Sequence, residues 1–186
     1  MAESVHMDNS PMLRTTRLLG RPITFLDFGR LRSIHGDPRV AITLSANGLP
    51  FSNAHTRQSV RSWTQHWRDH GFGVWLFHKP DGEFVGYAGL MCGSIDNKPG
   101  VELLYATRSD FWKDGYATEM AAAVVRFAFE SAGLAELVAF TLPANLGSRR
   151  VMEKCGFHYE RDIEHAGLPH VLYRLASPQF LPGRKS

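Results

Sequence analysis

The segment that most constrains the fold is an alanine-rich helix set between two strand-like runs. Residues Ala117–Ser131 carry the strongest helical pattern of the chain, and Gly133 supplies a helix end. The run 101–107 before this helix alternates in the manner of a strand, and 136–142 after it does the same. Strands therefore alternate with helices in the second half of the chain. This pattern predicts an α/β (α+β) domain with a mixed sheet.

The remaining segments predict more strands early and one more helix late. Helical spacing indicates helices over 26–34 and over 56–70, the second capped by Thr56 and ended by Gly71. Segment 96–100 has the composition of a turn. No linker or repeat interrupts the pattern, so we expect one domain over 13–176 with tails at 1–12 and 177–186. The other expected elements are a short helix over 146–154 and strands over 73–78, 83–91 and 171–175.

Composition excludes several classes of protein. The 186 residues, 44% of them hydrophobic, suffice for one core, and no apolar run approaches the ~20 residues of a membrane span. The net charge of +3 is too mild to indicate nucleic acid, although it suits a phosphate-bearing ligand. Cys92 and Cys155 lack the spacing of zinc or redox motifs, and the N-terminal residues lack a signal pattern. We therefore expect a cytoplasmic protein without a membrane or nucleic-acid partner.

The turn before the alanine-rich helix is a candidate anion site. It reads Arg108-Ser-Asp-Phe-Trp-Lys-Asp-Gly-Tyr-Ala-Thr-Glu119 and places Gly115 at the helix entrance. Backbone N–H groups at a helix start lack intrahelical acceptors, and the helix dipole favours negative charge there. Gly115 would let a phosphate approach the backbone, with Lys113 and Arg108 adding charge. The alternative is an ordinary capped helix with an exposed polar turn.

A second candidate stretch surrounds the short helix near the C-terminus. Asn145 stands at its N-cap position, Ser148 lies on its first turn, and Gly156 follows its end. An amide and a hydroxyl at this spacing project to nearby points and can hold one ligand together. By contrast, His66 and His70 have the spacing of zinc ligands without a third ligand, so no metal is expected.

Three blocks of the chain together resemble the GNAT superfamily of acyl-CoA N-acetyltransferases, in its branch of ribosomal-protein N-terminal acetyltransferases. The first block is the opening strand at 13–22. The second runs from Tyr105 through the turn to Glu119, and the third combines 145–157 with 173–175. The order and spacing of the blocks, which span 13–176, carry the resemblance.

The resemblance implies acetyl-CoA as cosubstrate, bound in a cleft where two central strands splay apart. The pantetheine arm would pair with the backbone of Leu104, Tyr105 and Ala106, and Asn145 would hold it from the other side. A backbone N–H of that strand would stabilise the thioester oxygen. The pyrophosphate would bind the turn formed by Trp112, Lys113, Asp114, Gly115, Tyr116, Ala117 and Thr118.

The chain departs from the superfamily pattern at positions that matter for proton transfer. Lys113 replaces a glycine common in the branch, and Met152 stands where many members have a tyrosine acid. Ser148 is therefore the candidate proton donor to the thiolate, unless it only hydrogen-bonds the cosubstrate. Glu102 is the candidate general base, and its alternative is a solvated strand residue.

The sequence leaves the acceptor open. The leading hypothesis is an enzyme that acetylates a primary amine, either a protein N-terminus or a small molecule. A polyamine, amino-acid or antibiotic acetyltransferase on the same scaffold is one alternative. A non-catalytic acyl-CoA-binding or sensing module is another, because the tyrosine acid is missing. We expect a monomer or a homodimer.

Overall fold

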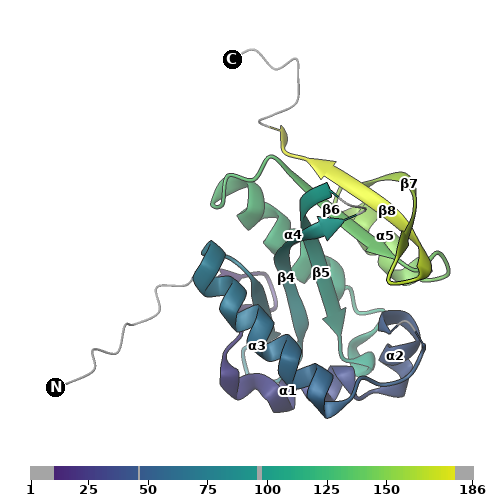
Figure 1. Cartoon of the computed structure of the whole chain (residues 1–186). Helices are drawn as coiled ribbons and strands as arrows, with labels where there is room; N and C mark the ends of the chain where they lie inside the picture. Colours follow the sequence, from purple (N-terminus) through teal and green to yellow (C-terminus); the bar gives the residue numbers. More distant parts are fainter. Residues whose placement is uncertain (1–10, 46, 96–97, 179–186) are drawn as a thin grey trace.

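The computed structural model describes residues 11–45, 47–95 and 98–178, which form one eight-stranded sheet with helices on both faces (Figure 1). The expected tails therefore lie almost wholly outside the described residues. The strand order is β1-β2-β3-β4-β5-β6-β8-β7, and every pairing is antiparallel except β5 with β6. The bounds are β1 (Leu13–Arg14), β2 (Leu19–Pro22), β3 (Val74–His78), β4 (Phe84–Ile95), β5 (Lys98–Thr107), β6 (Glu136–Thr141), β7 (His158–His165) and β8 (Leu168–Ala176).

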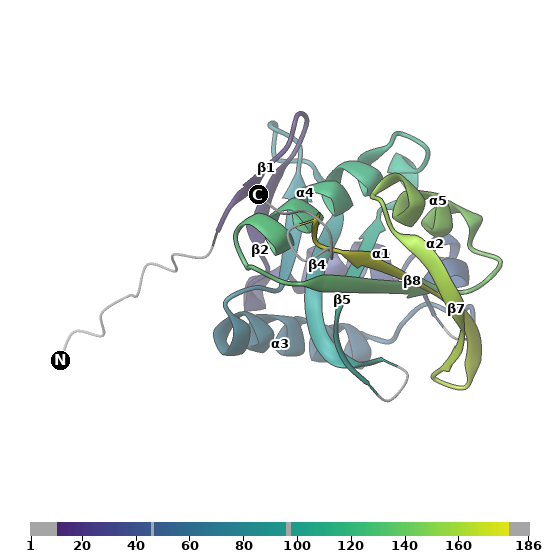
Figure 2. The ribbon, with the colours of Figure 1, turned by 90° about the horizontal axis from the view of Figure 1, so that it is seen from above.

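The helices cover the two faces of the sheet separately. One face carries α4 (Tyr116–Glu130), which packs on β4 and β5, and α5 (Leu146–Lys154), which contacts α4. The other carries α3 (Asn53–His70), which contacts β3 and α1 (Phe28–His35), and α1 in turn contacts α2 (Pro38–Leu44). Figure 2 shows α4 and α5 on one side of the strands and α3 on the other. The core runs through both layers and includes fully buried Trp75, Leu90 and Met120.

The sheet opens between its two central strands. β5 and β6 pair at one register position, where Glu102 lies opposite Val138. β5 continues to Thr107 along β4, whereas β6 leaves it and pairs with β8. The edge of β5 at Leu104–Ala106 is therefore not covered by β6. The expected fold class and the expected splay of two central strands are both confirmed.

The structure corrects several of the predicted element boundaries. Helix α3 begins at Asn53, capped by the Ser52 side chain, so Thr56 is not its cap. Thr56 is instead fully buried and donates to the Ser52 carbonyl at 3.2 Å. Among the α-helices and strands of the described residues, α2 and β7 were not predicted. The expected turn over 96–100 lies outside the described residues at 96–97, and from Lys98 onward the chain is already strand.

Within the described residues, no helix combines the length and the apolar character needed to cross a membrane.

Candidate active site

A pocket of about 1000 Å³ occupies the opening between β5 and β6. Its walls come from β5, the start of α4, the end of β6, α5, α2 and the turn between β7 and β8. Nearly all the predicted site residues line this pocket, from Glu102 on β5 to Ser148 on α5. Asp114 is the exception, and its carbonyl instead accepts a hydrogen bond from Arg17 at 3.1 Å. Segments far apart in the sequence thus meet in one cavity.

The start of α4 presents backbone donors to the pocket. Gly115 is the N-cap residue with φ of 82°, and no side chain caps the helix there. The first-turn residues Tyr116, Ala117 and Thr118 line the pocket, and their N–H groups precede the first intrahelical donor, Glu119. Such a terminus suits a phosphate group, because its donors and its dipole both favour an anion.

The turn before α4 has a left-handed backbone at two positions. Besides Gly115, Lys113 has φ of 72°, a conformation that favours glycine. This explains why glycine is common there in the branch that the chain resembles. At Lys113 the chain accepts some backbone strain and gains a cation on the pocket wall.

Arg17 supports this turn from outside, which sequence reasoning did not foresee. Its backbone N–H and its guanidinium donate to the Glu119 carboxylate at 2.8 Å and 2.7 Å. The guanidinium also lies 4.1 Å from the centre of the Tyr116 ring. Arg17 belongs to the turn between β1 and β2, and no local sequence signal links it to a helix about a hundred residues away.

The cations of the pocket differ in part from those expected. Lys113, Arg150 and Lys154 line the pocket, on or next to α4 and α5. Arg108 does not line it. Its guanidinium donates to Asp110 at 2.9 Å and to the Phe84 carbonyl at 3.3 Å, in a different depression of the surface. The prediction that Arg108 adds charge at the phosphate turn is therefore wrong.

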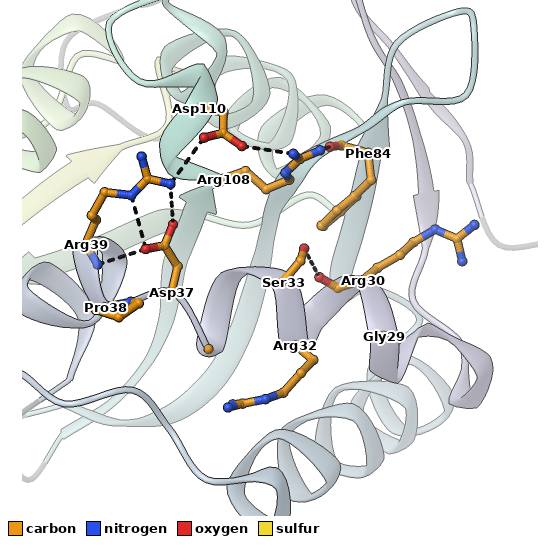
Figure 3. A pocket seen from close by; sticks show the side chains of 11 residues that line it. Gly29, Arg30, Arg32, Ser33, Asp37, Pro38, Arg39, Phe84, Arg108 and Asp110 are labelled. Atoms are coloured by element: carbon orange, nitrogen blue, oxygen red, sulfur yellow. Dashed lines mark hydrogen bonds and ion pairs between the residues drawn. The ribbon is translucent and has the colours of Figure 1, made fainter.

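A second depression of about 690 Å³ lies beside α1, α2 and the segment before α4 (Figure 3). Four arginines line it, but the acids Asp37 and Asp110 neutralise those at its upper rim. Arg39 lies 3.2 Å from each of these carboxylates, and Ser109 donates to Asp37. This network fastens the N-terminus of α2 to the segment that leads into α4, so it positions the main pocket.

Asn145 caps α5, as the sequence predicts. Its carbonyl oxygen accepts from the Ser148 N–H at 3.1 Å. Its amide group donates to the Thr141 hydroxyl at 3.1 Å and to the Thr43 carbonyl of α2 at 3.4 Å. Asn145 therefore joins α5 to the end of β6 and to α2 at the rim of the pocket. A role toward pantetheine stays a prediction.

Ser148 is paired with a residue whose side chain the sequence analysis left without a role. The Tyr105 phenol donates to the Ser148 carbonyl at 3.0 Å, and the two hydroxyl oxygens are 2.9 Å apart. Burial raises the pKa of Tyr105 well above its usual value, which keeps the phenol protonated. Because the phenol proton serves the carbonyl, the Ser148 hydroxyl is free to donate toward the phenol oxygen or toward a ligand.

Glu102 lines the pocket from the opposite face of β5. Ala106 lies on the same face of β5 as Glu102 and is paired with Tyr87 of β4. The Tyr87 ring lies 5.0 Å from the Trp63 ring of α3, so this face of β5 is turned toward α3. Burial raises the pKa of the Glu102 carboxyl from 4.5 to about 7. The described residues offer this carboxylate no hydrogen bond or ion pair. An unpaired carboxyl that titrates near neutrality suits a proton acceptor.

Among the described residues, one cluster of potential metal ligands lies outside the pocket. His66, His70 and Cys92 present ligand atoms within 4.8 Å of one another. Both ring nitrogens of His66 are already bonded, one to the Phe72 carbonyl at 2.8 Å and one to the Cys92 N–H at 2.9 Å. His66 therefore acts as a structural link between α3 and β4, and the expected absence of a metal stays a prediction.

The comparisons with known proteins agree with this architecture. A family model described as "Acetyltransferase (GNAT) domain" matches residues 17–158. FsC-acetyl coenzyme A-N(2)-transacetylase of Aspergillus fumigatus is 34% identical over 78% of this chain, which spans 64% of that protein. An acetyltransferase structure from Agrobacterium tumefaciens is 26% identical with a TM-score of 0.78, covering 95% of this chain and all of its own.

A structure of RimL, a ribosomal alpha-N-protein acetyltransferase, in complex with coenzyme A also shares the fold. Its TM-score is 0.72 at 15% identity, covering 90% of this chain and 98% of its own. The chain belongs to the GNAT family, and its class is that of the acetyl-CoA-dependent N-acetyltransferases. The resemblance noted from the three blocks is thereby confirmed for the superfamily, and the likeness to RimL is one of fold.

Proposed function

We propose that the chain transfers an acetyl group from acetyl-CoA directly to a primary amine, with Glu102 as general base. The carrying observation is one pocket that passes between β5 and β6 and joins two chemically different ends. The donors of α4 and the cations Lys113 and Arg150 suit the phosphates of the cosubstrate. Glu102, on the other face of β5, suits the ammonium of an acceptor.

The residues fit acetyl-CoA in three respects. The start of α4 would hold the pyrophosphate, the uncovered edge of β5 at Leu104–Ala106 would pair with the pantetheine arm, and Asn145 would close the other side. A backbone N–H of this edge would stabilise negative charge on the thioester oxygen. The acetyl group would then lie where β5 and β6 separate, within reach of side chains from both faces of β5.

The proton transfers divide between the faces of β5. Glu102 takes a proton from the ammonium, which frees the lone pair to form the new C–N bond. As the C–S bond breaks, the second proton of the amine nitrogen neutralises the departing thiolate, and the Ser148 hydroxyl donates a hydrogen bond to the sulfur, while the Tyr105 phenol donates to the Ser148 carbonyl. A thiolate with a pKa near ~8.5 is a tolerable leaving group, so this donor contributes less than the base.

The experiment is amine-dependent release of CoA thiol from acetyl-CoA, with the acetylated amine detected by mass spectrometry. We expect equal amounts of both products and no thiol release without an amine. Tight acetyl-CoA binding without turnover on any amine would contradict the proposal and support the alternative of a non-catalytic acyl-CoA-binding module. The acceptor classes left open by the sequence, from a protein N-terminus to a polyamine, are compared in the same assay.

A further inference from the structure

The acceptor end of the pocket has one wall of stacked rings near the start of α3. Phe51 and His55 both line the pocket, and their rings are stacked with centres 4.2 Å apart. His35 contacts Phe51 at 4.9 Å and reaches the Tyr87 ring at 6.3 Å. The rings therefore form a continuous row from Tyr87 to the pocket surface. Burial and the nearby charge of Glu102 both raise the pKa of Tyr87.

The position of Phe51 in this wall is fixed by its backbone. Its N–H donates to the His35 carbonyl at 2.9 Å, and its carbonyl accepts from the Arg32 guanidinium. The ring is thus held in place before any ligand arrives. Preorganised rings of this kind bind flat apolar groups with little loss of side-chain entropy.

A second wall of rings stands on the other side of the opening. Phe140 lies two residues beyond Val138 on β6, and Val138 is the register partner of Glu102. Side chains at alternate positions share a face, so Phe140 and Glu102 point to the same side of the sheet. His165, the last residue of β7, and His170 on β8 have ring centres 4.5 Å and 5.6 Å from that of Phe140, and both line the pocket.

The acceptor end carries a single carboxylate. Glu102 is the only carboxylate among the described residues that line the pocket, whose three permanent cations lie on or next to α4 and α5. Burial lowers the pKa of His165, with the neighbouring His170 adding to the effect, which leaves that imidazole neutral at neutral pH. A burial that lowers the pKa of His35 to about 4 keeps that ring neutral as well.

We propose that the acceptor is a primary monoamine on an uncharged aromatic body, that is, an arylalkylamine; this inference rests on the proposed function. The amine would pair with Glu102 while the ring packs between the Phe51–His55 wall and the Phe140–His165 wall. A second ammonium, as in a polyamine, would meet no second carboxylate. A carboxylate, as in a free amino acid, would meet no cation and would lie near Glu102. A polyamine and a free amino acid would therefore each bind with one uncompensated charge.

The test compares two amines that differ by one charged group. 2-Phenylethylamine and phenylalanine share the ring and the amine, but phenylalanine adds a carboxylate. We expect kcat/KM with acetyl-CoA to be at least about tenfold higher for 2-phenylethylamine than for phenylalanine or spermidine, because an unpaired polar group discriminates strongly. Equal or better activity on phenylalanine, on spermidine or on a peptide N-terminus would overturn the acceptor class while leaving the acetyl transfer intact.

A binding measurement separates this inference from the proposed function. Calorimetry on the CoA-bound protein should detect 2-phenylethylamine and no phenylalanine at the same concentration. If this selectivity appears without turnover on any amine, the catalytic proposal fails and the ligand class stands. If 2-phenylethylamine does not bind, or binds no better than phenylalanine, the ligand class is wrong.

Ring-removing variants locate the effect. Phe51→Leu and Phe140→Leu keep an apolar side chain and remove the ring, so we expect KM for 2-phenylethylamine to rise by about fivefold or more with KM for acetyl-CoA unchanged. Phe25→Leu is the matched control, because the Phe25 ring is exposed and lies outside the pocket. Unchanged KM in both pocket variants would contradict the assignment of the rings to the acceptor.

Discussion

The two ends of the pocket between β5 and β6 are built by different parts of the polypeptide. At the proposed phosphate end the backbone would provide the binding groups, since the N–H groups of Tyr116, Ala117 and Thr118 begin α4 without a side-chain cap. At the proposed acceptor end side chains would provide them, with Glu102 on one strand and rings from three other segments. The backbone donors of the proposed phosphate end are therefore local in sequence, although Arg150 and Lys154 of α5 add charge to it, and the proposed acceptor end is assembled by the tertiary fold.

This difference decides which variants affect which substrate. A backbone site depends on small residues that keep φ positive and leave room, so a single local change should weaken the cosubstrate alone. A side-chain site depends on the protonation state and shape of separate groups, so its variants should change turnover or acceptor affinity. The predictions below test this division, beginning with the largest expected effect.

The largest effect is expected from Glu102→Gln. The amide keeps the shape of the side chain and cannot take a proton, so turnover at pH 7 should fall by ~10²–10⁴-fold. Part of this loss should return at high pH, where the amine is already unprotonated. The measurement is kcat against pH, together with KM for acetyl-CoA, which should stay unchanged. Wild-type turnover of this variant at every pH would show that Glu102 is a plain strand residue.

The raised pKa of Glu102 also predicts a pH-dependent stability difference. Below pH 4.5 the carboxyl is protonated in both folded and unfolded chains, and its burial has no charge to penalise. As pH rises from 4.5 to about 7 the unfolded chain ionises first, so folded stability is lost across this window and stays lower above it.

Glu102→Gln should therefore gain stability over the wild type as pH rises through that window. The free energy of unfolding should differ little at pH 4.5 and by up to about 3 kcal/mol above pH 7, with the variant the more stable. Denaturant titrations at several pH values measure this difference. A difference that does not depend on pH would mean that the carboxyl titrates normally.

A smaller effect on stability is expected from Asn145→Asp. Aspartate caps a helix as well as asparagine does, but it loses the amide donor to Thr141 and Thr43. We expect the free energy of unfolding to fall by about 1 kcal/mol. Acetyl-CoA affinity should fall as well if the amide also holds the pantetheine arm. Asn145→Ser, a neutral cap without an amide, is the control; unchanged affinity in both variants would limit Asn145 to capping.

The smallest effects are expected for the hydroxyl pair on the other face of β5. Ser148→Ala and Tyr105→Phe should each lower kcat by about two- to tenfold with little recovery at high pH, because a thiolate leaves with modest assistance. Their effects should not add in the double variant, since the two hydroxyls form one hydrogen-bonded pair. Fully additive losses would show that the two groups act separately.

Sequence reasoning placed Gly115 at the start of α4 and Asn145 at the cap of α5 because both follow from residue types at fixed spacing. The structure adds that Gly115 has φ of 82° and that no side chain caps α4, and the phosphate site itself stays a prediction. Arg108 was misplaced because a charge close in sequence does not fix the direction of its side chain. Arg17 was missed because its contact with Glu119 is formed only when distant parts of the chain fold together, and it leaves no local signal in the sequence.

The unpredicted elements have equally physical explanations. Pro38 reads as a helix breaker after α1, but it occupies the first turn of α2, where a missing N–H costs nothing and Asp37 caps. β7 is a polar edge strand in which Ile163 is the buried residue, so it lacks clear alternation of apolar and polar residues. The second ring wall includes His165 at the end of β7, so it could not be predicted without that strand.

The division between the two ends is tested most directly by titrating acetyl-CoA into three variants and the wild type. Gly115→Asp places a carboxylate where the pyrophosphate would bind, and Gly115→Asn is its neutral match, with similar tolerance of the positive φ at this position. We expect the Kd to rise at least about tenfold in Gly115→Asp, much less in Gly115→Asn, and not at all in Glu102→Gln. Equal affinity of the two Gly115 variants and the wild type, or a weakened Glu102→Gln, would contradict the separation of a backbone-built phosphate end from a side-chain-built acceptor end.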